Sequence, residues 1–332
     1  MTTDTAAISQ RVLEIDPARE SEKIRDHIKA SLAADLKRRG LVIGISGGID
    51  STVTAALAVR SLGPKRVILL QMPERHSAEE THQFSDIAAS FLGIEPIHED
   101  ITGILHAAGF YRRYDEAVRT VIPEYGTGWK SKLVLRGAGD GARYNLFSLV
   151  AESPEGEVVT KRLPHQTYLA IVAATNFKQR IRKMLEYYHA DRTNYAVAGT
   201  PNRLEYDQGF FVKLGDGAAD IKPIAHLYKS QVYQLAEYLG VPEEICSRPP
   251  TTDTYSLAQG QDEFYFALPY PQMDLCLYAK NNSIPATEIA PIVRLEPEHV
   301  ERVYRDIDSK RSTTRYLHLP PLLADRVPEV GC

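Results

Sequence analysis

Residues 41–51 decide the fold and read Leu41-Val42-Ile43-Gly44-Ile45-Ser46-Gly47-Gly48-Ile49-Asp50-Ser51. The apolar start of this stretch predicts a short buried strand that runs directly into a glycine-rich loop. Residues 50–62 are rich in Ala and Leu and predict a helix after the loop. Two adjacent glycines allow close approach of the backbone to a ligand, and the N–H groups at a helix start carry partial positive charge. The stretch therefore predicts a phosphate-binding strand–loop–helix unit.

The polar residues of the loop indicate which phosphate chemistry it serves. Ser46 and Ser51 supply hydroxyl donors, and Asp50 is useful to an anion only if Mg²⁺ bridges it to phosphate oxygens. Because no Lys follows Gly48, the loop differs from the GxxxxGK[ST] pattern and fits pyrophosphate leaving the α-phosphorus better than γ-phosphoryl transfer. The alternative is a Gly-Gly turn in which Ser and Asp merely cap a helix.

Strands and helices alternate on both sides of this loop. Ile24, Ile28, Leu32 and Leu36 recur at four-residue steps and predict an amphipathic helix over 21–39. The expected strands after the loop are 66–72, 95–101 and 194–200, and the expected helices are 78–92, most of 103–120 and 167–189. Such alternation predicts the α/β class, with a doubly wound parallel sheet, helices on both of its faces and the site at the carboxyl ends of its strands.

One segment interrupts the alternation. Within about residues 121–165, the segments 146–150 and 157–160 predict a β-hairpin. An insertion of this size is an active-site lid, a partner contact or an inert addition, and the sequence leaves all three open. The chain after residue 200 reads as loop-rich, with a last helix over 296–308. The predicted organisation is a polar arm over 1–20, one domain over 21–315 that contains the insertion, and a tail over 316–332.

Composition excludes several classes of function. The net charge of −4 provides no basic surface for nucleic acid, and the apolar runs are too short to span a membrane. Residues 1–10 lack a signal-peptide pattern, so we expect a cytoplasmic location. Cys246, Cys276 and Cys332 are widely spaced without a CxxC pair, which argues against disulfide, metal and thiol-based sulfur-transfer roles.

Residues 46–51, SGGIDS, resemble the signature of the N-type ATP pyrophosphatases, which include NAD, GMP and asparagine synthetases. Over roughly residues 20–315, the later segments resemble ammonia-dependent NAD synthetases in order and spacing. The matching segments are NFKQRIR at 176–182, GTPNRLE at 199–205, GFFVKLGDGAAD at 209–220, PTTD at 250–253, QDE at 261–263 and Lys310-Arg311.

The resemblance implies a set of ligand-binding residues. For ATP and pyrophosphate these are Gly44, Ile45, Ser46, Gly47, Gly48, Ile49, Asp50, Ser51, Thr200, Lys229 and Thr251. For deamido-NAD or another acyl substrate they are Arg180, Lys213, Asp220 and Lys310, and for Mg²⁺ they are Asp50 and Glu205. The cations suit a cleft that holds two nucleotides, and two neighbouring carboxylates are costly unless a cation lies between them. Without this context, Lys213 and Lys229 would be predicted to be surface residues, and Asp216 and Asp220 to be turn formers in a glycine-rich loop.

The implied activity is ATP-dependent amidation of deamido-NAD to NAD through an acyl-adenylate. The resemblance also implies ATP as co-substrate, Mg²⁺, a homodimer, and ammonia that is free or comes from a separate partner. The sequence departs from the family pattern at Ser309, which stands in place of His, at 265–267 and in the 121–165 insertion. Because these departures lie near the acyl-substrate residues, two alternatives stay open: a related ligase for another carboxylate, and a catalytically silent nucleotide-binding scaffold.

Overall fold

A four-stranded parallel sheet carries the loop. The computed structural model describes residues 9–77, 79–136, 146–249, 254–257, 260, 265–266 and 268–330. The strands of the sheet are β1 (Leu41–Gly44), β2 (Val67–Gln71), β3 (Ile97–His98) and β7 (Ala196–Val197), in the spatial order β3-β2-β1-β7. β1 pairs in parallel with β2 and with β7, and β2 pairs in parallel with β3. The predicted strands at 95–101 and 194–200 are therefore present but shorter.

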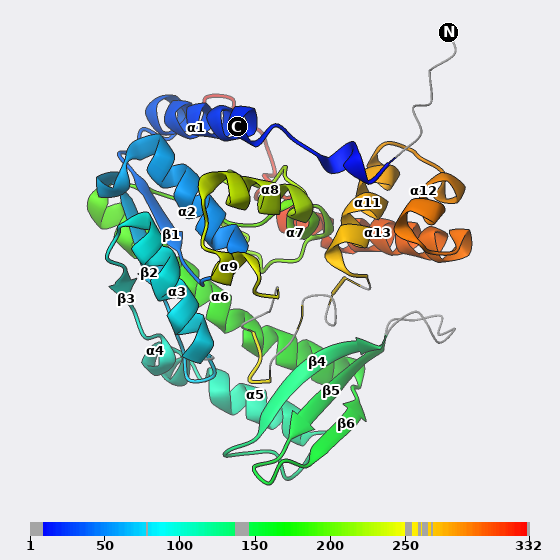
Figure 1. The fold of residues 1–332 in the computed structure, drawn as a ribbon. Coiled ribbons are helices and arrows are strands. Elements are labelled where there is room, and N and C mark those ends of the chain that lie inside the picture. Colours follow the sequence, from blue (N-terminus) through cyan, green and yellow to red (C-terminus); the bar gives the residue numbers. More distant parts are fainter. Residues whose placement is uncertain are drawn as a thin grey trace.

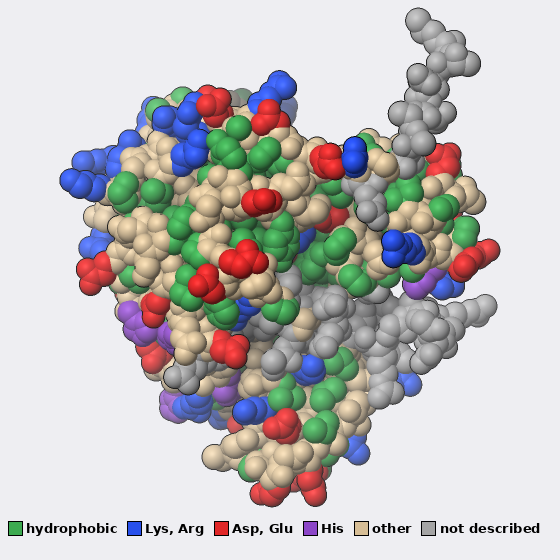
Figure 2. Space-filling model, viewed as in Figure 1, with side chains coloured by type: hydrophobic (Ala, Val, Ile, Leu, Met, Phe, Trp, Pro, Cys, Tyr) green, Lys and Arg blue, Asp and Glu red, His purple; other side chains and the backbone are tan. Residues whose placement is uncertain are grey.

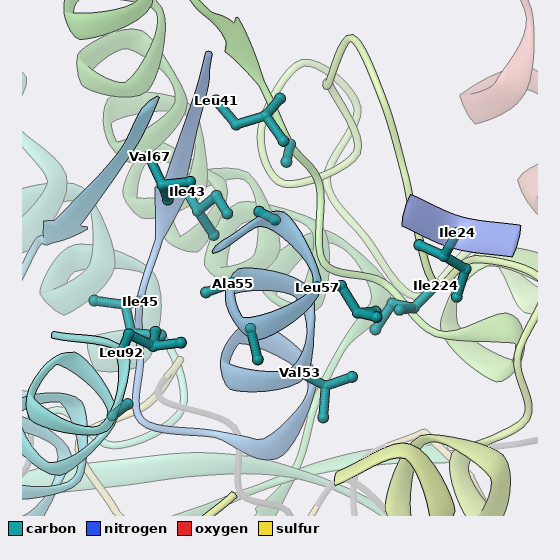
Figure 3. Close-up of a cluster of buried hydrophobic side chains, with 14 of the residues drawn as sticks. Ile24, Leu41, Ile43, Ile45, Val53, Ala55, Leu57, Val67, Leu92 and Ile224 are labelled. Atoms are coloured by element: carbon teal, nitrogen blue, oxygen red, sulfur yellow. The ribbon is translucent and has the colours of Figure 1, made fainter. Parts of the chain in front are cut away.

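Helices cover both faces of this sheet because successive residues of β1 point to opposite sides. Leu41 and Ile43 pack in one core with α1 (Pro17–Ala30), α2 (Ile49–Leu62), α3 (Glu79–Leu92) and α8 (Lys229–Leu239), part of which Figure 3 shows. Val42 packs in a second core with α4 (Thr102–Ala107), α5 (Phe110–Arg119) and α6 (His165–Thr193). The doubly wound α/β fold is confirmed.

The order of the strands places the site. The chain proceeds from β1 to β2 and β3 on one side, and later returns to β7 on the other side of β1. In such sheets, ligands bind outside the carboxyl ends of the strands where the direction reverses. Here that point lies between the ends of β1 and β7, at Ser46 and Gly199. α6 runs from the parallel sheet toward a second sheet (Figure 1).

The second sheet is formed by the 121–165 segment. β4 (Lys130–Arg136), β5 (Leu146–Glu152) and β6 (Val158–Arg162) are antiparallel in the order β4-β5-β6. β5 and β6 form the predicted hairpin. β4 is an additional strand that was not predicted, because the first half of the segment is rich in glycine. Leu133, Leu149 and Ala151 are fully buried in the core shared with α5 and α6, so the sheet packs against these helices.

The part after residue 200 is helical rather than loop-rich. It contains α7 (Arg203–Gln208), α8, α9 (Glu243–Cys246), α11 (Tyr270–Asn281), α12 (Ala286–Val293) and α13 (Pro297–His318). α11 buries the consecutive residues 273–277 and so lacks the one-sided apolar stripe by which a helix is recognised in a sequence. α13 continues ten residues past its expected end, through a largely exposed stretch with no apolar signal.

The ends of the chain also carry structure. At the amino end, a 3₁₀ helix, η1 (Gln10–Leu13), precedes α1, and Leu13 is buried against the C-terminal helices. A short π-helical segment, η2 (Ser31–Asp35), follows α1, and a 3₁₀ turn, η3 (Pro64–Arg66), precedes β2. None of the described helices is long and apolar enough to cross a membrane. Acidic and basic side chains are both scattered over the described part of the face in Figure 2.

Candidate functional site

The glycine-rich loop turns sharply at Gly47. Its φ of 71° lies in the left-handed region, and a Cβ at this position would lie 2.5 Å from the backbone carbonyl carbon of Phe84. Both facts require glycine. α2 begins at Ile49 directly after Gly48, which provides no side-chain cap. The first N–H groups of α2 thus remain available to an anionic ligand.

Hydroxyl groups brace the loop from within. The Ser51 hydroxyl donates to the Gly48 carbonyl at 2.9 Å and lies 3.2 Å from the Ser46 hydroxyl. The Thr52 hydroxyl donates to the same carbonyl at 2.9 Å. The loop is therefore held open in a fixed shape by short-range bonds, as a preorganised anion site requires.

A buried cluster of charges lies beside the loop. Lys229, the first residue of α8, is 1% exposed, and its ammonium pairs with the Asp50 carboxylate. The side-chain amide of Asn202 donates to Asp50 Oδ1 at 3.4 Å. The same Asn202 forms a capping box with Glu205 at the start of α7, with bonds of 3.1 and 3.2 Å. The fold thus brings together Asp50, Glu205 and Lys229, which lie far apart in the sequence but were predicted to share one site.

Electrostatics explain why these charges are found together. Burial and the neighbouring charge of Asp50 raise the pKa of Glu205 to about 8. Burial alone would lower the pKa of Lys229, but the charges of Asp50 and Glu205 outweigh it and raise that pKa. The ammonium is therefore held charged, and it offsets part of the repulsion between the two carboxylates.

Asp274 is a residue of the site that sequence reasoning missed. This carboxylate is fully buried on α11 and accepts hydrogen bonds from the backbone N–H groups of Lys229 at 3.3 Å and Ser230 at 2.7 Å. Burial raises its pKa to about 6. It caps the start of α8 and so fixes the backbone from which Lys229 extends. The available signal was a lone acid within the apolar run Met273–Leu277.

A cavity of about 480 Å³ opens over this cluster. Its wall includes the following residues predicted to bind ATP: Gly44, Ile45, Ser46, Gly48, Ile49, Asp50, Ser51, Thr200 and Lys229. Glu205 lines the cavity as well, whereas Gly47 does not, in agreement with its role in shaping the turn. Thr251, Asp253 and residues 261–263 lie outside the described residues.

The four residues predicted for the acyl substrate lie elsewhere, and none of them is part of the cavity wall. Arg180 is exposed on α6, and its Nε donates to the Lys213 carbonyl at 3.3 Å. The Lys213 ammonium donates to the Tyr316 and Leu319 carbonyls at the end of α13. The Asp220 carboxylate accepts the Val197 N–H at 2.7 Å, and the Lys310 ammonium pairs with Asp306 at 2.6 Å. These residues have clear structural contacts, and a role in binding stays a prediction.

Other charged residues line the cavity without having been predicted to do so. Lys183 and Glu186 form a buried pair at 2.5 Å, and Arg182 Nε donates to the Met72 carbonyl at 3.2 Å. Asp216 accepts the Val212 N–H at 2.7 Å and also lines the cavity. Burial raises the pKa of both Glu186 and Asp216. The signal available in the sequence was the spacing of Arg182, Lys183 and Glu186, which places them on one face of α6.

A preorganised anion loop at the switch point of a parallel sheet, with a buried lysine at its side, defines an α/β protein that binds the phosphates of a nucleotide. The NAD synthase family matches residues 20–122 and 153–315, and the chain belongs to this family. A relative from Rhizobium meliloti (strain 1021), the NH(3)-dependent NAD(+) synthetase, is 56% identical over 97% of this chain and 96% of its own length.

Solved structures share the fold. An NMN synthetase from Francisella tularensis has a TM-score of 0.65 and is 22% identical, with 94% of this chain and 100% of that chain covered. The NH3-dependent NAD synthetase from Campylobacter jejuni has a TM-score of 0.62 at 22% identity, with the same coverage.

Proposed function

We propose that this chain is an enzyme that makes NAD from deamido-NAD, ATP and ammonia. The nicotinate carboxylate attacks the α-phosphorus of ATP, which forms an acyl-adenylate and expels pyrophosphate. Ammonia then attacks the acyl carbon, loses a proton and expels AMP. The observation that carries the proposal is the ion pair of the buried Lys229 with the partly buried Asp50 beside the open start of α2, in a member of the NAD synthase family.

The loop and Lys229 are suited to the leaving pyrophosphate. Negative charge develops on this group as the bond to the α-phosphorus breaks, and N–H groups at a helix start stabilise such charge. The Ser46 hydroxyl lines the cavity at the same place, whereas the Ser51 hydroxyl donates to the Gly48 carbonyl and fixes the shape of the loop. Lys229 adds a full positive charge that is already oriented by Asp50, so little reorganisation accompanies the reaction.

The donor set fits Mg²⁺. Among the described residues no group of three or more His, Cys, Asp or Glu could form a complete protein cage for a metal. Mg²⁺ in nucleotide sites takes one or two carboxylates together with substrate phosphates. Asp50 and Glu205 provide two carboxylates, and the raised pKa of Glu205 reflects burial beside a like charge that a cation would offset. When bound, Mg²⁺ would neutralise phosphate charge between these two side chains.

The second step depends on the exclusion of water, because water would hydrolyse the acyl-adenylate. A side chain that acts as a general base is not required, since ammonia loses its proton after attack and positioning supplies much of the rate. We infer that the ammonia is free or comes from a separate partner. We also infer a cytoplasmic homodimer in which Arg180, Lys213, Asp220 and Lys310 contact deamido-NAD, and Thr251 contacts ATP.

The test is to incubate the protein with ATP, Mg²⁺, ammonium and deamido-NAD, and to follow pyrophosphate release and NAD by mass. Asp50→Asn leaves the buried Lys229 without its counter-charge, so the folded fraction is checked by circular dichroism, and the folded variant should lose several kcal/mol of transition-state stabilisation, about 10²–10³-fold in rate. The matched control is Asp26→Asn, because Asp26 is exposed on α1 and pairs only locally with Arg25. Its rate should equal that of the wild type.

Two other outcomes would replace the proposal. Pyrophosphate release with another carboxylate, and none with deamido-NAD, would identify a related amide ligase. Tight ATP binding without turnover of any carboxylate would identify a silent nucleotide-binding scaffold. Normal turnover by Asp50→Asn at saturating Mg²⁺ would show that Asp50 is not a metal ligand.

A further inference from the structure

The insertion reaches the ligand cavity through one aromatic residue. The family match stops at residue 122 and resumes at residue 153, so β4 and β5 lie outside the part of the chain that defines the family. Phe147 of β5 nevertheless lines the same cavity as the glycine-rich loop. Its ring stacks on that of Tyr168 of α6, with ring centroids 4.2 Å apart and an angle of 17° between the planes. An addition to the family fold therefore supplies part of the cavity wall.

The position of this pair follows from α6. The residues of α6 that line the cavity, from Tyr168 to Glu186, recur at helical spacing and form one stripe: Tyr168, Val172, Thr175, Asn176, Gln179, Arg182, Lys183 and Glu186. Eighteen residue steps at 1.5 Å each extend about 27 Å. Glu186 lies at the loop end, because a Cβ on Gly44 would be 3.2 Å from its carboxylate oxygen. The Phe147–Tyr168 pair therefore lies at the far end from the loop.

The rest of the insertion holds Phe147 in place. Leu149 and Ala151 share its face of β5 and are fully buried, and the Phe147 carbonyl accepts the Leu163 N–H at 3.0 Å. β4 also anchors a second part of the wall, since the Ser131 N–H donates to the Ser256 hydroxyl at 2.8 Å. Thr254 and Tyr255, next to this anchor, line the cavity. The aromatic pair is therefore a rigid platform.

The reacting ends of the two substrates must meet in the cavity, and the places of the substrates there can be separated. Gly47 packs on Phe84 of α3, so α3 stands directly beside the loop that receives the phosphates. Thr81, His82 and Ser85 of α3 line the cavity on that side, which gives the nucleoside of ATP a place next to its phosphates. The first half of α6 and β5 are then left for the second substrate, whose carboxylate must reach the α-phosphorus.

We infer that the Phe147–Tyr168 pair is a specificity-determining platform on which a planar ring of the acyl substrate stacks. Aromatic faces bind heteroaromatic rings by stacking, which contributes about 1–3 kcal/mol per base. The inference rests on the proposed function, because it assigns to the platform the ring of the dinucleotide that lies at the opposite end from the reacting carboxylate. It also gives the insertion a purpose: the insertion builds the wall of the site.

The experiment compares Phe147→Ala, Phe147→Tyr and the control Leu149→Val in the full chain. KM is measured separately for deamido-NAD and for ATP, and the folded fraction is checked by circular dichroism. Phe147→Ala should raise KM for deamido-NAD about 5- to 100-fold, while KM for ATP stays within twofold. Phe147→Tyr should restore most of the affinity. Leu149→Val, in the same strand but outside the cavity wall, should alter stability and leave both KM values unchanged.

Each remaining outcome has a definite meaning. An unchanged KM for deamido-NAD in folded Phe147→Ala would overturn the inference. An increase only in KM for ATP would also overturn it, because it would assign the platform to the adenine ring of ATP. A similar increase of KM for deamido-NAD in Leu149→Val would overturn it as well, because it would show that Phe147 acts only through the packing of β5. Failure of the wild type to form NAD would overturn the proposed function, and the substrate assignment with it.

Discussion

Replacement of Gly47 by alanine should be far more destabilising than replacement of Gly48, although the two residues are adjacent. Gly47 has a φ of 71°, and a Cβ there would lie 2.5 Å from the backbone of Phe84 and Ser85. Gly48 has a φ of −81°, and among the described residues its Cβ would meet only the Ser46 hydroxyl, at 3.4 Å. The first position is therefore closed to any side chain and the second is open.

The magnitudes follow from these contacts. A left-handed backbone costs a non-glycine residue about 1–2 kcal/mol, and forcing a methyl group against packed backbone costs about 1–3 kcal/mol more. Gly47→Ala should thus lower the free energy of unfolding by about 2–5 kcal/mol. For Gly48→Ala, reduced freedom of the unfolded chain offsets the weaker helix cap, so stability should stay within about 1 kcal/mol of the wild type.

Urea unfolding followed by circular dichroism measures both changes, and pyrophosphate release measures the effect on the loop. Gly47→Ala should lose activity in step with the displaced loop, since the start of α2 can no longer hold its place beside α3. If both variants unfold at the same urea concentration, or if Gly48→Ala is the less stable, the argument from φ and contact distance is refuted.

Three further changes test the buried charges. Lys229→Met should cost about 1–3 kcal/mol of stability, because it leaves the partly buried Asp50 without its cation, and added Mg²⁺ should recover part of this loss in thermal unfolding. Asp274 has a folded pKa of about 6, above the ordinary value, so its contribution to the free energy of unfolding falls by about 3 kcal/mol as pH rises from about 4 to 6. Asp274→Asn should lack this decline when unfolding is measured across the same pH range. Glu74→Gln breaks a fully buried pair with Lys178 at 2.6 Å and should lower the free energy of unfolding by about 3–5 kcal/mol. Glu116→Gln, in an exposed pair, should change it by no more than about 0.5 kcal/mol, and equal losses would contradict the role of burial.

The sequence alone determined the parallel α/β sheet and the anion loop. These features depend on local signals: apolar strand-length runs, helical spacing and two glycines at a strand end. It also determined that Asp50, Glu205 and Lys229 belong to one site, through resemblance to a family whose segments follow in the same order. Periodicity by itself would have read Lys229 as a surface residue, whereas the structure buries it.

Tertiary structure decided what no local signal carries. Asp274 acts on Lys229 from 45 residues away, because α11 packs against the start of α8. β4 and the helices after residue 200 are stabilised by packing in shared cores, so their sequences lack the one-sided patterns of surface elements. Phe147 is a member of the cavity wall only because β5 packs on α6, and contacts between distant segments follow from the fold rather than from the spacing of residues along the chain.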